Sequence, residues 1–271
     1  MIPCISQVTT LSASFDADVR GYAGVKCEAI EVWLTKLETF LADHSLEAVK
    51  QLASDCGVTL AAAAVQGGIL LAQGDARREA FALFERRLEL CQSLRIPTMV
   101  VAADFTSEVT ETDYERAVVS LKQAGQLARE RGVRLALEFQ SRAAFCNNLS
   151  TAAALVEHCD KPNVGICLDV FHYYTGPSKF EDLALLPPKR LFHVQLSDLA
   201  GTPRELAGDS DRVLPGDGDF LLGPIIEHLR AIGYDGCISV ELMNPNIWQL
   251  EPVQVAEVAV TSVRRLLGLT Y

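Results

Sequence analysis

The sequence predicts an α/β protein in which eight parallel strands alternate with eight helices and close into a single (β/α)₈ barrel. Short apolar or β-branched runs alternate with longer runs of helical periodicity along the whole chain. Strands that are joined through helices are usually parallel. The length of 271 residues also suits one such barrel, which typically needs about 250 residues.

An open, doubly wound sheet is the competing architecture. Such folds often carry Gly-x-Gly-x-x-Gly at the first strand–helix junction, and this sequence has none there. It also has no low-complexity linker and no long Pro-, Gly- or Ser-rich tract. We therefore expect residues 1–271 to form one domain.

The predicted strands are short apolar runs bounded by turn residues, a pattern typical of strands that are buried on both faces. They are Pro3–Thr10, Ala29–Leu34, Thr59–Val65, Thr98–Ala103, Arg134–Phe139, Val164–Val170, Leu191–Ser197 and Cys237–Leu242.

The segments between these runs place apolar residues at steps of three and four, the period of an amphipathic helix. The predicted helices are Phe15–Val25, Ser45–Cys56, Asp75–Leu94, Asp113–Arg131, Ser150–Cys159, Lys179–Leu186, Phe220–Ile232 and Gln254–Leu267. Asp113 and Ser150 are the expected N-caps of their helices. Gly57 and Gly132 are expected to end theirs.

Composition and charge exclude several classes of protein. Hydrophobic residues make up 49% and charged residues 22%, which supports a packed core and excludes a disordered chain. The formal net charge is −11, from 24 basic and 35 acidic residues, whereas proteins that bind nucleic-acid phosphates are usually basic. We expect no nucleic-acid partner, and an acidic surplus on solvated outer helices.

We expect a cytoplasmic protein without a membrane partner. No apolar run reaches the roughly 18–20 residues of a membrane-spanning helix, and the N-terminus lacks the basic and apolar segments of a signal peptide. The eight cysteines are scattered, without a Cys-x-x-Cys pair. They are therefore expected to be reduced and mostly buried.

A polar residue ends each of the last four predicted strands. These residues are Glu138, Asp169, Gln195 and Glu241. Because side chains alternate between the two faces of a strand, each carboxylate shares its face with a small residue two positions earlier. This parity aims the carboxylates into the mouth of the barrel, where the C-terminal ends of the strands converge.

Carboxylates crowded there would repel one another, and burying them unpaired is costly. A divalent cation would relieve this, and an oxygen-rich set favours Mg²⁺ or Mn²⁺. Gln195 is preferred as the ligand from the seventh strand because it lies one layer nearer the C-terminal end than His193. His193 is the alternative ligand, and is otherwise assigned to substrate binding or to the barrel interior. Any single carboxylate could instead be a cap or an ion-pair partner, but four strand ends in succession favour a shared site.

Two further residues are candidates for catalysis or substrate binding. His172 follows the sixth strand and is a candidate catalytic residue, although it could merely cap a loop. The connection from Asp198 to Phe220 is long and rich in glycine, as lids and binding loops often are. Within it, Arg212 is a candidate substrate contact because a guanidinium suits oxyanions and paired hydroxyls. The alternative for Arg212 is a surface ion pair with Asp209 or Asp211.

Three further residues have two interpretations each. Trp248 is assigned to substrate binding, and Trp33 is a second candidate for a pocket wall; core or rim packing is the alternative for both. Glu31 could line the site or form an ion pair inside the barrel.

The segment from Leu135 to Trp248 resembles the xylose-isomerase-like TIM-barrel superfamily. The motifs that carry the resemblance are Leu-Glu-Phe, Leu-Asp-Val-Phe-His, His-Val-Gln-Leu-Ser-Asp, Pro-Gly-Asp-Gly-Asp-Phe, Gly-Tyr-Asp-Gly and Ser-Val-Glu-Leu. In strand–helix order the resemblance covers essentially the full chain. The superfamily includes sugar epimerases, hydroxypyruvate isomerase, inosose and 3-dehydroshikimate dehydratases, and endonuclease IV. The last is disfavoured, because its trinuclear zinc site needs more histidines than the five present here.

The resemblance implies metal ligation by the same four strand-end residues, and substrate contacts for His172 and Arg212. Many members carry histidine at the position of Gln195, whereas glutamine is known from the hydroxypyruvate isomerase branch and some dehydratases. It further implies that Glu138 and Glu241 act as acid and base around a metal-stabilised enediolate.

We therefore predict a Mg²⁺- or Mn²⁺-dependent isomerase or epimerase of carbohydrate metabolism, acting on a sugar or hydroxy-ketone. The alternative is a metal-dependent dehydratase, a lyase, of a cyclic polyol ketone such as inosose or 3-dehydroshikimate. A non-catalytic sugar-binding barrel is disfavoured because none of the four strand-end ligands is lost. A homo-oligomer is compatible with the apolar C-terminal helix, but core packing explains that helix equally well.

Overall fold

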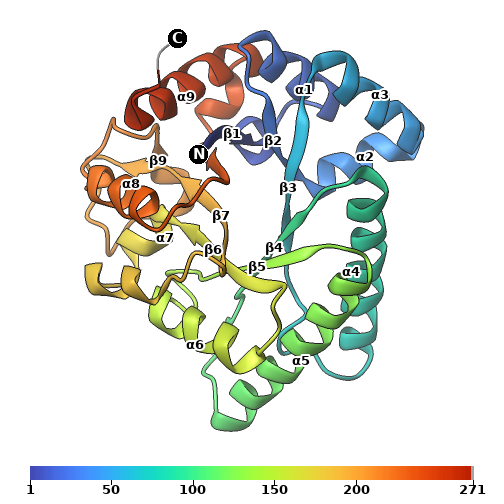
Figure 1. Ribbon diagram of the computed structural model, residues 1–271, viewed down its shortest axis with the longest axis vertical. Coiled ribbons are helices and arrows are strands. Elements are labelled where there is room, and N and C mark those ends of the chain that lie inside the picture. Colours follow the sequence, from blue (N-terminus) through green and yellow to red (C-terminus); the bar gives the residue numbers. More distant parts are fainter. Residues whose placement is uncertain (270–271) are drawn as a thin grey trace. The chain divides into compact units, whose positions relative to one another are not determined.

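The computed structural model describes residues 1–269, and its eight long strands follow the predicted runs. They are β1 (Ile2–Ser6), β2 (Ala29–Trp33), β3 (Thr59–Gln66), β4 (Thr98–Ala102), β5 (Arg134–Glu138), β6 (Val164–Asp169), β7 (Leu191–Leu196) and β10 (Cys237–Val240). These strands form a closed barrel in the order β1-β10-β7-β6-β5-β4-β3-β2 (Figure 1). The predicted fold class is thereby confirmed. A short antiparallel pair, β8 (Asp198–Leu199) with β9 (Arg212–Val213), stands apart from the barrel sheet.

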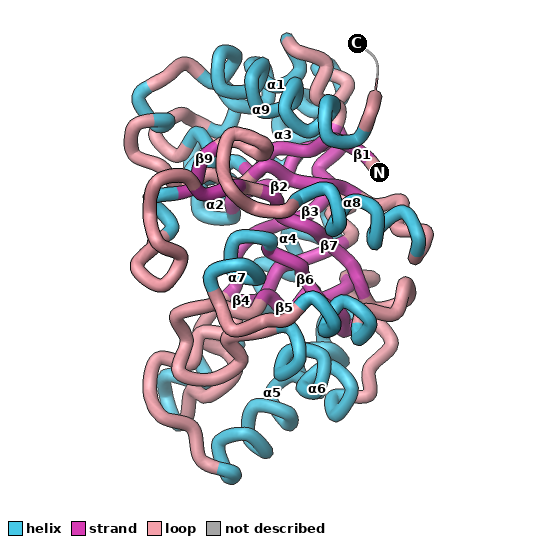
Figure 2. Tube along the Cα trace, turned by 90° about the vertical axis from the view of Figure 1, so that its left-hand side faces the viewer, coloured by secondary structure: helices cyan, strands magenta, loops and turns pink. Residues whose placement is uncertain are grey.

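Helices separate the eight barrel strands along the chain (Figure 2). The α-helices are α1 (Phe15–Gly24), α2 (Leu34–Asp43), α3 (Leu46–Cys56), α4 (Gly74–Leu94), α5 (Glu111–Glu130), α6 (Leu149–Cys159), α7 (Val170–Thr175), α8 (Leu222–Ala231) and α9 (Pro252–Leu267). The 3₁₀ helices are η1 (Gln7–Thr10), η2 (Phe180–Leu185), η3 (Asp209–Asp211) and η4 (Ile247–Gln249).

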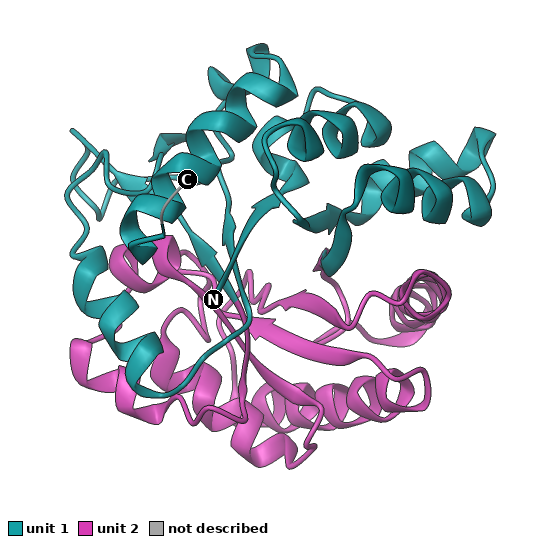
Figure 3. Cartoon of the chain, turned by 45° about the horizontal axis from the view of Figure 1, so that its top comes forward, with its two compact units in different colours: residues 1–63, 194–271 teal, residues 64–193 magenta. Residues whose placement is uncertain are grey.

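The chain divides into two compact units (Figure 3). Unit 1 comprises Met1–Ala63 and Val194–Tyr271, and unit 2 comprises Ala64–His193. That all 271 residues form one domain stays a prediction.

In unit 1, strand β1 lies between β10 and β2, and β10 pairs in turn with β7. All three pairings are parallel. The register places Ile5 beside Val240 and Ser6 beside Glu31. Helices α1 and α9 pack against each other. Because these three strands are neighbours, the segments that follow β1, β2 and β10 begin close together.

In unit 2, strands β4, β5 and β6 run side by side in parallel. The register places Glu138 beside Ala102 on one side and Cys167 on the other. Gly165 of β6 lies so close to the next segment that a Cβ there would be 2.3 Å from the carbonyl oxygen of Arg190. No side chain fits at that distance, so glycine is required.

The first predicted strand, Pro3–Thr10, is wrong in its second half. Strand β1 ends at Ser6, and Gln7–Thr10 form η1, whose four residues are all buried. A run that is buried on every side does not reveal from its periodicity where the strand ends.

Two predicted helix N-caps are also wrong. Thr110, not Asp113, caps α5: its hydroxyl accepts a hydrogen bond from the Asp113 amide at 3.3 Å, and the Asp113 carboxylate accepts one from the Thr110 amide at 3.1 Å. Asn148, not Ser150, caps α6 by accepting a bond from the Thr151 amide at 3.0 Å. In both helices, polar residues occupy the N-cap and also the first turn. The sequence pattern alone therefore does not show which of them is the cap.

Helices α2 and α7 were not predicted, because each begins directly after a strand and apolar residues continue across the junction. The helix predicted at Lys179–Leu186 is the 3₁₀ helix η2 instead. The following Pro187-Pro188 pair cannot continue a helix. The C-terminal glycines Gly57 and Gly132 adopt the left-handed conformation, with φ of 65° and 71°.

None of the eight cysteines, all of which lie within the described residues, forms a disulfide bond. Over residues 1–269, no helix has both the length and the apolar character needed to cross a bilayer.

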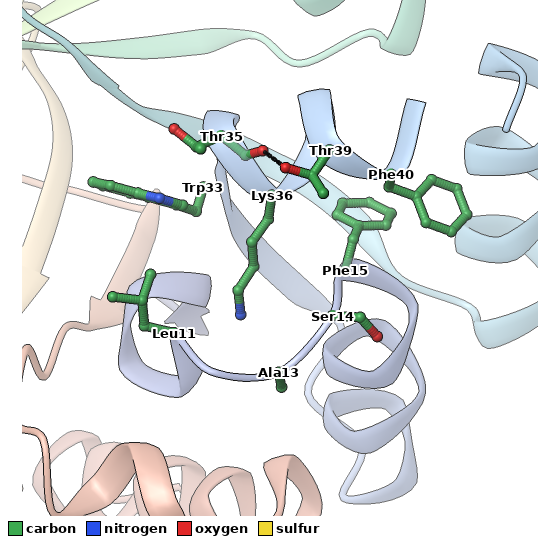
Figure 4. Close-up of a pocket in the computed structure, with 9 residues that line it drawn as sticks. All are labelled: Leu11, Ala13, Ser14, Phe15, Trp33, Thr35, Lys36, Thr39 and Phe40. Atoms are coloured by element: carbon green, nitrogen blue, oxygen red, sulfur yellow. Dashed lines mark hydrogen bonds between the residues drawn. The ribbon is translucent and has the colours of Figure 1, made fainter. Parts of the chain in front are cut away.

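A buried charge cluster secures η1 to its neighbours in unit 1. The Lys36 ammonium donates to Asp18 Oδ2 at 2.5 Å and to the carbonyl oxygens of Gln7 and Thr10 at 3.1 and 2.6 Å. Thr10 Oγ1 donates to Asp18 Oδ1 at 2.7 Å and contacts the Tyr22 hydroxyl. All three ammonium hydrogens therefore have an acceptor. Figure 4 shows the Lys36 side chain extending from α2 toward the segment between η1 and α1.

This cluster makes stability depend on pH. Burial raises the pKa of the Asp18 carboxyl from its ordinary 3.8 to about 6, despite the opposing attraction of Lys36. Between about pH 4 and pH 6 the folded protein then binds more protons than the unfolded chain. The free energy of unfolding therefore falls as pH rises. We expect Asp18 to contribute a fall of about 1–2 kcal/mol between about pH 4 and pH 6.

Urea denaturation at several pH values, on the wild type and Asp18→Asn, measures this contribution. The asparagine does not titrate, so its stability should fall less steeply over the same range. Equal slopes for the two proteins would contradict the raised pKa.

Candidate functional site

Unit 2 gathers three buried polar side chains at the ends of neighbouring strands. Glu138 is the last residue of β5, Asp169 is the last residue of β6, and His172 lies in α7. One potential ligand atom from each lies within 4.8 Å of the others. Two predicted metal ligands and the predicted catalytic histidine therefore lie together in this unit.

Asp169 holds the start of α7. Its Oδ1 accepts hydrogen bonds from the amides of Phe171 and His172 at 2.7 and 3.4 Å, the usual role of an aspartate N-cap. Its Oδ2 lies 3.7 Å from His172 Nε2. Because the helix begins directly after the strand, His172 is turned back over the carboxylate that precedes it.

The His172 ring is oriented from its other nitrogen. Nδ1 lies 3.1 Å from Ser141 Oγ, which lies 2.9 Å from Thr175 Oγ1. The Thr175 hydroxyl donates to the carbonyl oxygen of Phe171 at 2.7 Å. Ser141, which Thr175 contacts in turn, therefore holds the His172 ring from its Nδ1 side. Nε2 of the same ring faces the Asp169 carboxylate.

Glu138 has a partner that the sequence analysis missed. Gln140 Nε2 donates to Glu138 Oε2 at 2.5 Å. Gln140 lies only two positions after Glu138, just beyond the end of β5, so its nearness in the sequence was a signal. Gln140 fixes the orientation of the Glu138 carboxylate.

Unit 1 holds a second buried network around Glu241. Gln195 Nε2 donates to Glu31 Oε1 and to Glu241 Oε1, both at 2.9 Å. Arg212 Nη1 donates to Glu241 Oε2 at 3.2 Å. All four side chains are buried. Glu31, for which the sequence left two interpretations, thus belongs to this network as an acceptor from Gln195.

Arg212 is an interior residue. Its side chain is 1% exposed, and it donates to Asp209 Oδ1 at 2.9 Å as well as to Glu241. The surface ion pair considered for Arg212 is therefore wrong: the partner Asp209 is as expected, but the guanidinium is buried. Asn244 Nδ2 donates to the Arg212 carbonyl oxygen at 3.1 Å and also secures its backbone.

Asp198 ties together the two ends of the long connection after β7. Its carboxylate accepts hydrogen bonds from the amides of Leu199 and Phe220 at 2.9 Å and of Gly216 at 3.0 Å. A Cβ at Gly218 would lie 2.4 Å from Asp198 Oδ1, so the chain passes too close there for any other residue. Together with the β8–β9 pair, these contacts fix the segment that carries Arg212.

His193, Trp248 and Trp33 are the remaining candidates. His193 is buried in β7. Trp248 Nε1 donates to the Val8 carbonyl oxygen at 2.8 Å, which connects η4 to η1. Trp33 lines a mainly apolar pocket of about 310 Å³ between the η1–α1 segment and α2 (Figure 4). Substrate binding by His193 and Trp248 stays a prediction.

The family model for the xylose isomerase-like TIM barrel matches residues 21–266. The chain belongs to this family. The resemblance found in the sequence motifs is thereby confirmed.

Among curated relatives of this family member, an inosose isomerase from Halalkalibacterium halodurans is 27% identical over 267 residues, which are 94% of this chain and 93% of the relative. A D-psicose 3-epimerase from Agrobacterium fabrum is 29% identical over 244 residues, 85% of this chain and 80% of the relative. A 3-dehydroshikimate dehydratase from Pseudomonas aeruginosa is 29% identical over 164 residues, which cover 59% of this chain and 25% of that protein.

Among solved structures, the IolI protein with a bound zinc atom is similar to this chain with a TM-score of 0.94. The two sequences are 24% identical, and the match covers 99% of this chain and 98% of the other. This similarity supports the barrel fold.

The Asp198 carboxylate offers a direct test of how the Arg212 segment is held. In Asp198→Asn one oxygen becomes an NH₂ group that cannot accept a hydrogen bond, so at least one backbone amide loses its acceptor. We expect the free energy of unfolding to fall by about 1–3 kcal/mol. Urea denaturation measures the loss, and limited proteolysis should cut residues 199–220 faster.

Asp217→Asn is the matched control. Asp217 lies in the same segment, is exposed, and is 3.9 Å from exposed Arg265, so its loss should change stability by less than about 0.5 kcal/mol. If both variants were equally stable, Asp198 would not be the residue that closes the segment.

Proposed function

We propose that this protein is a divalent-metal-dependent isomerase or epimerase that moves a proton beside the carbonyl of a sugar or related hydroxy-ketone. The buried Glu138–Asp169–His172 cluster carries the proposal. Membership of the xylose isomerase-like family supports it, as do the inosose isomerase and D-psicose 3-epimerase relatives.

The donor atoms suit the proposed ion. Glu138 and Asp169 supply buried carboxylate oxygens whose repulsion a cation would relieve, and such hard donors favour Mg²⁺ or Mn²⁺. In the proposed ligand set Gln195 and Glu241 join them, because the strand ends of a barrel gather at one face. His172 Nε2 faces the Asp169 carboxylate and can form a hydrogen bond with a substrate hydroxyl. A divalent ion held there would supply a Lewis acid that acidifies a C–H bond beside a carbonyl.

The protein's own groups carry out the proton transfer. We assign Glu138 and Glu241 as the acid–base pair: one carboxylate takes the proton from carbon and the other returns one. Gln140 orients Glu138, while Gln195 and Arg212 orient Glu241. Return to the opposite face of the same carbon gives an epimer. Return to the neighbouring carbon, with a hydroxyl proton moved between the two adjacent oxygens, gives an aldose–ketose isomer.

A dehydratase is the second candidate, favoured by the 3-dehydroshikimate dehydratase among the relatives. It shares the first proton abstraction, after which a β-hydroxyl leaves. Only the product distinguishes the two reactions.

Proton NMR in D₂O with added Mg²⁺ tests the proposal on a panel of ketoses, hydroxypyruvate, inosose and 3-dehydroshikimate. We expect deuterium to enter a carbon beside the carbonyl of at least one compound. Glu138→Gln and Glu241→Gln should each slow this exchange by about 10²–10⁴-fold, the usual contribution of general acid–base catalysis. EDTA should abolish it, and adding back Mg²⁺, Mn²⁺ or Zn²⁺ identifies the effective metal.

Glu257→Gln, at an exposed position on α9, is the matched control and should retain the wild-type rate within twofold. Metal content measured on every variant separates loss of the base from loss of the ion. A rearranged sugar identifies an isomerase or epimerase, and an alkene or aromatic product identifies a dehydratase. No exchange with any panel compound, in protein that holds metal, would refute the proposed substrate class.

A further inference from the structure

The side chain of Thr9 is hydrogen-bonded to the backbone on both sides of Glu241. Thr9 belongs to η1 and is completely buried. Its hydroxyl donates to the carbonyl oxygen of Val240 at 3.0 Å and accepts from the amide of Leu242 at 3.0 Å. These are the backbone groups on either side of Glu241. One hydroxyl thus bonds both neighbours of the proposed acid–base residue.

These two hydrogen bonds lie just beyond the point where the pairing of β1 with β10 stops. The β1–β10 register runs from Ile2 beside Cys237 to Ile5 beside Val240, after which β1 turns into η1. Glu241 lies one residue beyond β10, and its own amide bonds to the Leu196 carbonyl on the other side at 3.2 Å. The Thr9 hydroxyl provides one donor and one acceptor, which are what a neighbouring strand would provide.

Thr9 is itself held in place by the charge cluster that secures η1. The Lys36 ammonium bonds to the carbonyl oxygens of Gln7 and Thr10, before and after Thr9. The Trp248 indole bonds to the Val8 carbonyl oxygen between them. With three backbone carbonyls of η1 bonded in this way, the Thr9 hydroxyl has little freedom to follow a displaced Glu241.

We propose that Thr9 is a positioning residue that fixes the backbone of Glu241 and thereby the direction of its carboxylate. The inference rests on the proposed function, because it gives Glu241 the acid–base role. Small displacements of a reacting group are costly in catalysis: a misplacement of about 1 Å can slow a reaction about 100-fold.

The experiment compares Thr9→Val, which keeps the shape and removes both hydrogen bonds, with Thr9→Ser, which keeps the hydroxyl. Thr9→Cys, with a weakly bonding thiol, replaces Thr9→Val if the valine variant does not fold. Thr98→Val is the matched control. Thr98 is a buried threonine at the start of β4 whose hydroxyl accepts one bond from Arg134 at 3.0 Å.

Two readouts are recorded for each variant. The first is the kcat and KM of deuterium exchange into inosose, or into the panel ketone that the wild type labels. The second is the solvent exchange of the Glu241 and Leu242 amides, measured by NMR on the folded protein without substrate.

For Thr9→Val we expect kcat to fall about 10- to 100-fold, with KM changed by less than about threefold because ground-state binding is retained. Thr9→Ser should recover most of the kcat, and Thr98→Val should match the wild type. The Leu242 amide should exchange faster than in the wild type in Thr9→Val alone, by about tenfold or more, because its acceptor is lost.

A Thr9→Val protein with wild-type kcat, or with unchanged Glu241 and Leu242 amide exchange, would overturn the inference. Equal losses in Thr9→Val and Thr98→Val would also overturn it, by showing a general effect of removing a buried hydroxyl. If the wild type labels no substrate, the proposed function fails, and the amide exchange still decides whether Thr9 holds the backbone of Glu241.

Discussion

Burying ionised carboxylates among apolar strands is costly unless each oxygen meets a donor or a cation, and the candidate site is organised around this constraint. Asp169 is bonded to two amides at the start of α7, and Asp198 to three amides of the long segment after β7. Glu241 accepts hydrogen bonds from the side-chain amide of Gln195 and the guanidinium of Arg212. Apart from Gln195, which lies within β7, these partners come from segments that follow a strand. Satisfying the carboxylates therefore also fixes the loops that carry the chemistry.

Unit 1 contains two buried ion pairs that both meet this need for donors but differ in what they hold in place. The Lys36–Asp18 pair is fully bonded within itself and to η1, so it stabilises a backbone segment. The Glu241–Arg212 pair lies at a strand end, and Gln195 joins it to Glu31. The two are linked through η1, because Thr9 connects the segment that Lys36 holds to the backbone of Glu241. A structural ion pair thus supports the proposed acid–base residue without touching it.

Much of this could be predicted from the sequence, because strand runs and side-chain parity are local properties. They located the eight strands and the carboxylates that end β5 and β6. Errors arose where two local patterns overlap. Gln7–Thr10 extends an apolar run but turns into η1, and α2 and α7 begin without a turn. Asp113 resembles an N-cap but lies inside the first turn that Thr110 caps.

The sequence by itself determined the barrel class and the acidic residues at its strand ends, since both follow from the order of apolar and polar residues along the chain. Only the tertiary structure decided which donors surround each carboxylate. Gln195 reaches Glu31 across 164 positions, and Thr9 reaches Val240 across 231. Such pairings depend on how segments far apart in the chain come to lie together. A local periodicity contains no information about contacts between such distant segments. The burial of Arg212 was hidden for the same reason, because its partner Glu241 is supplied by another strand end.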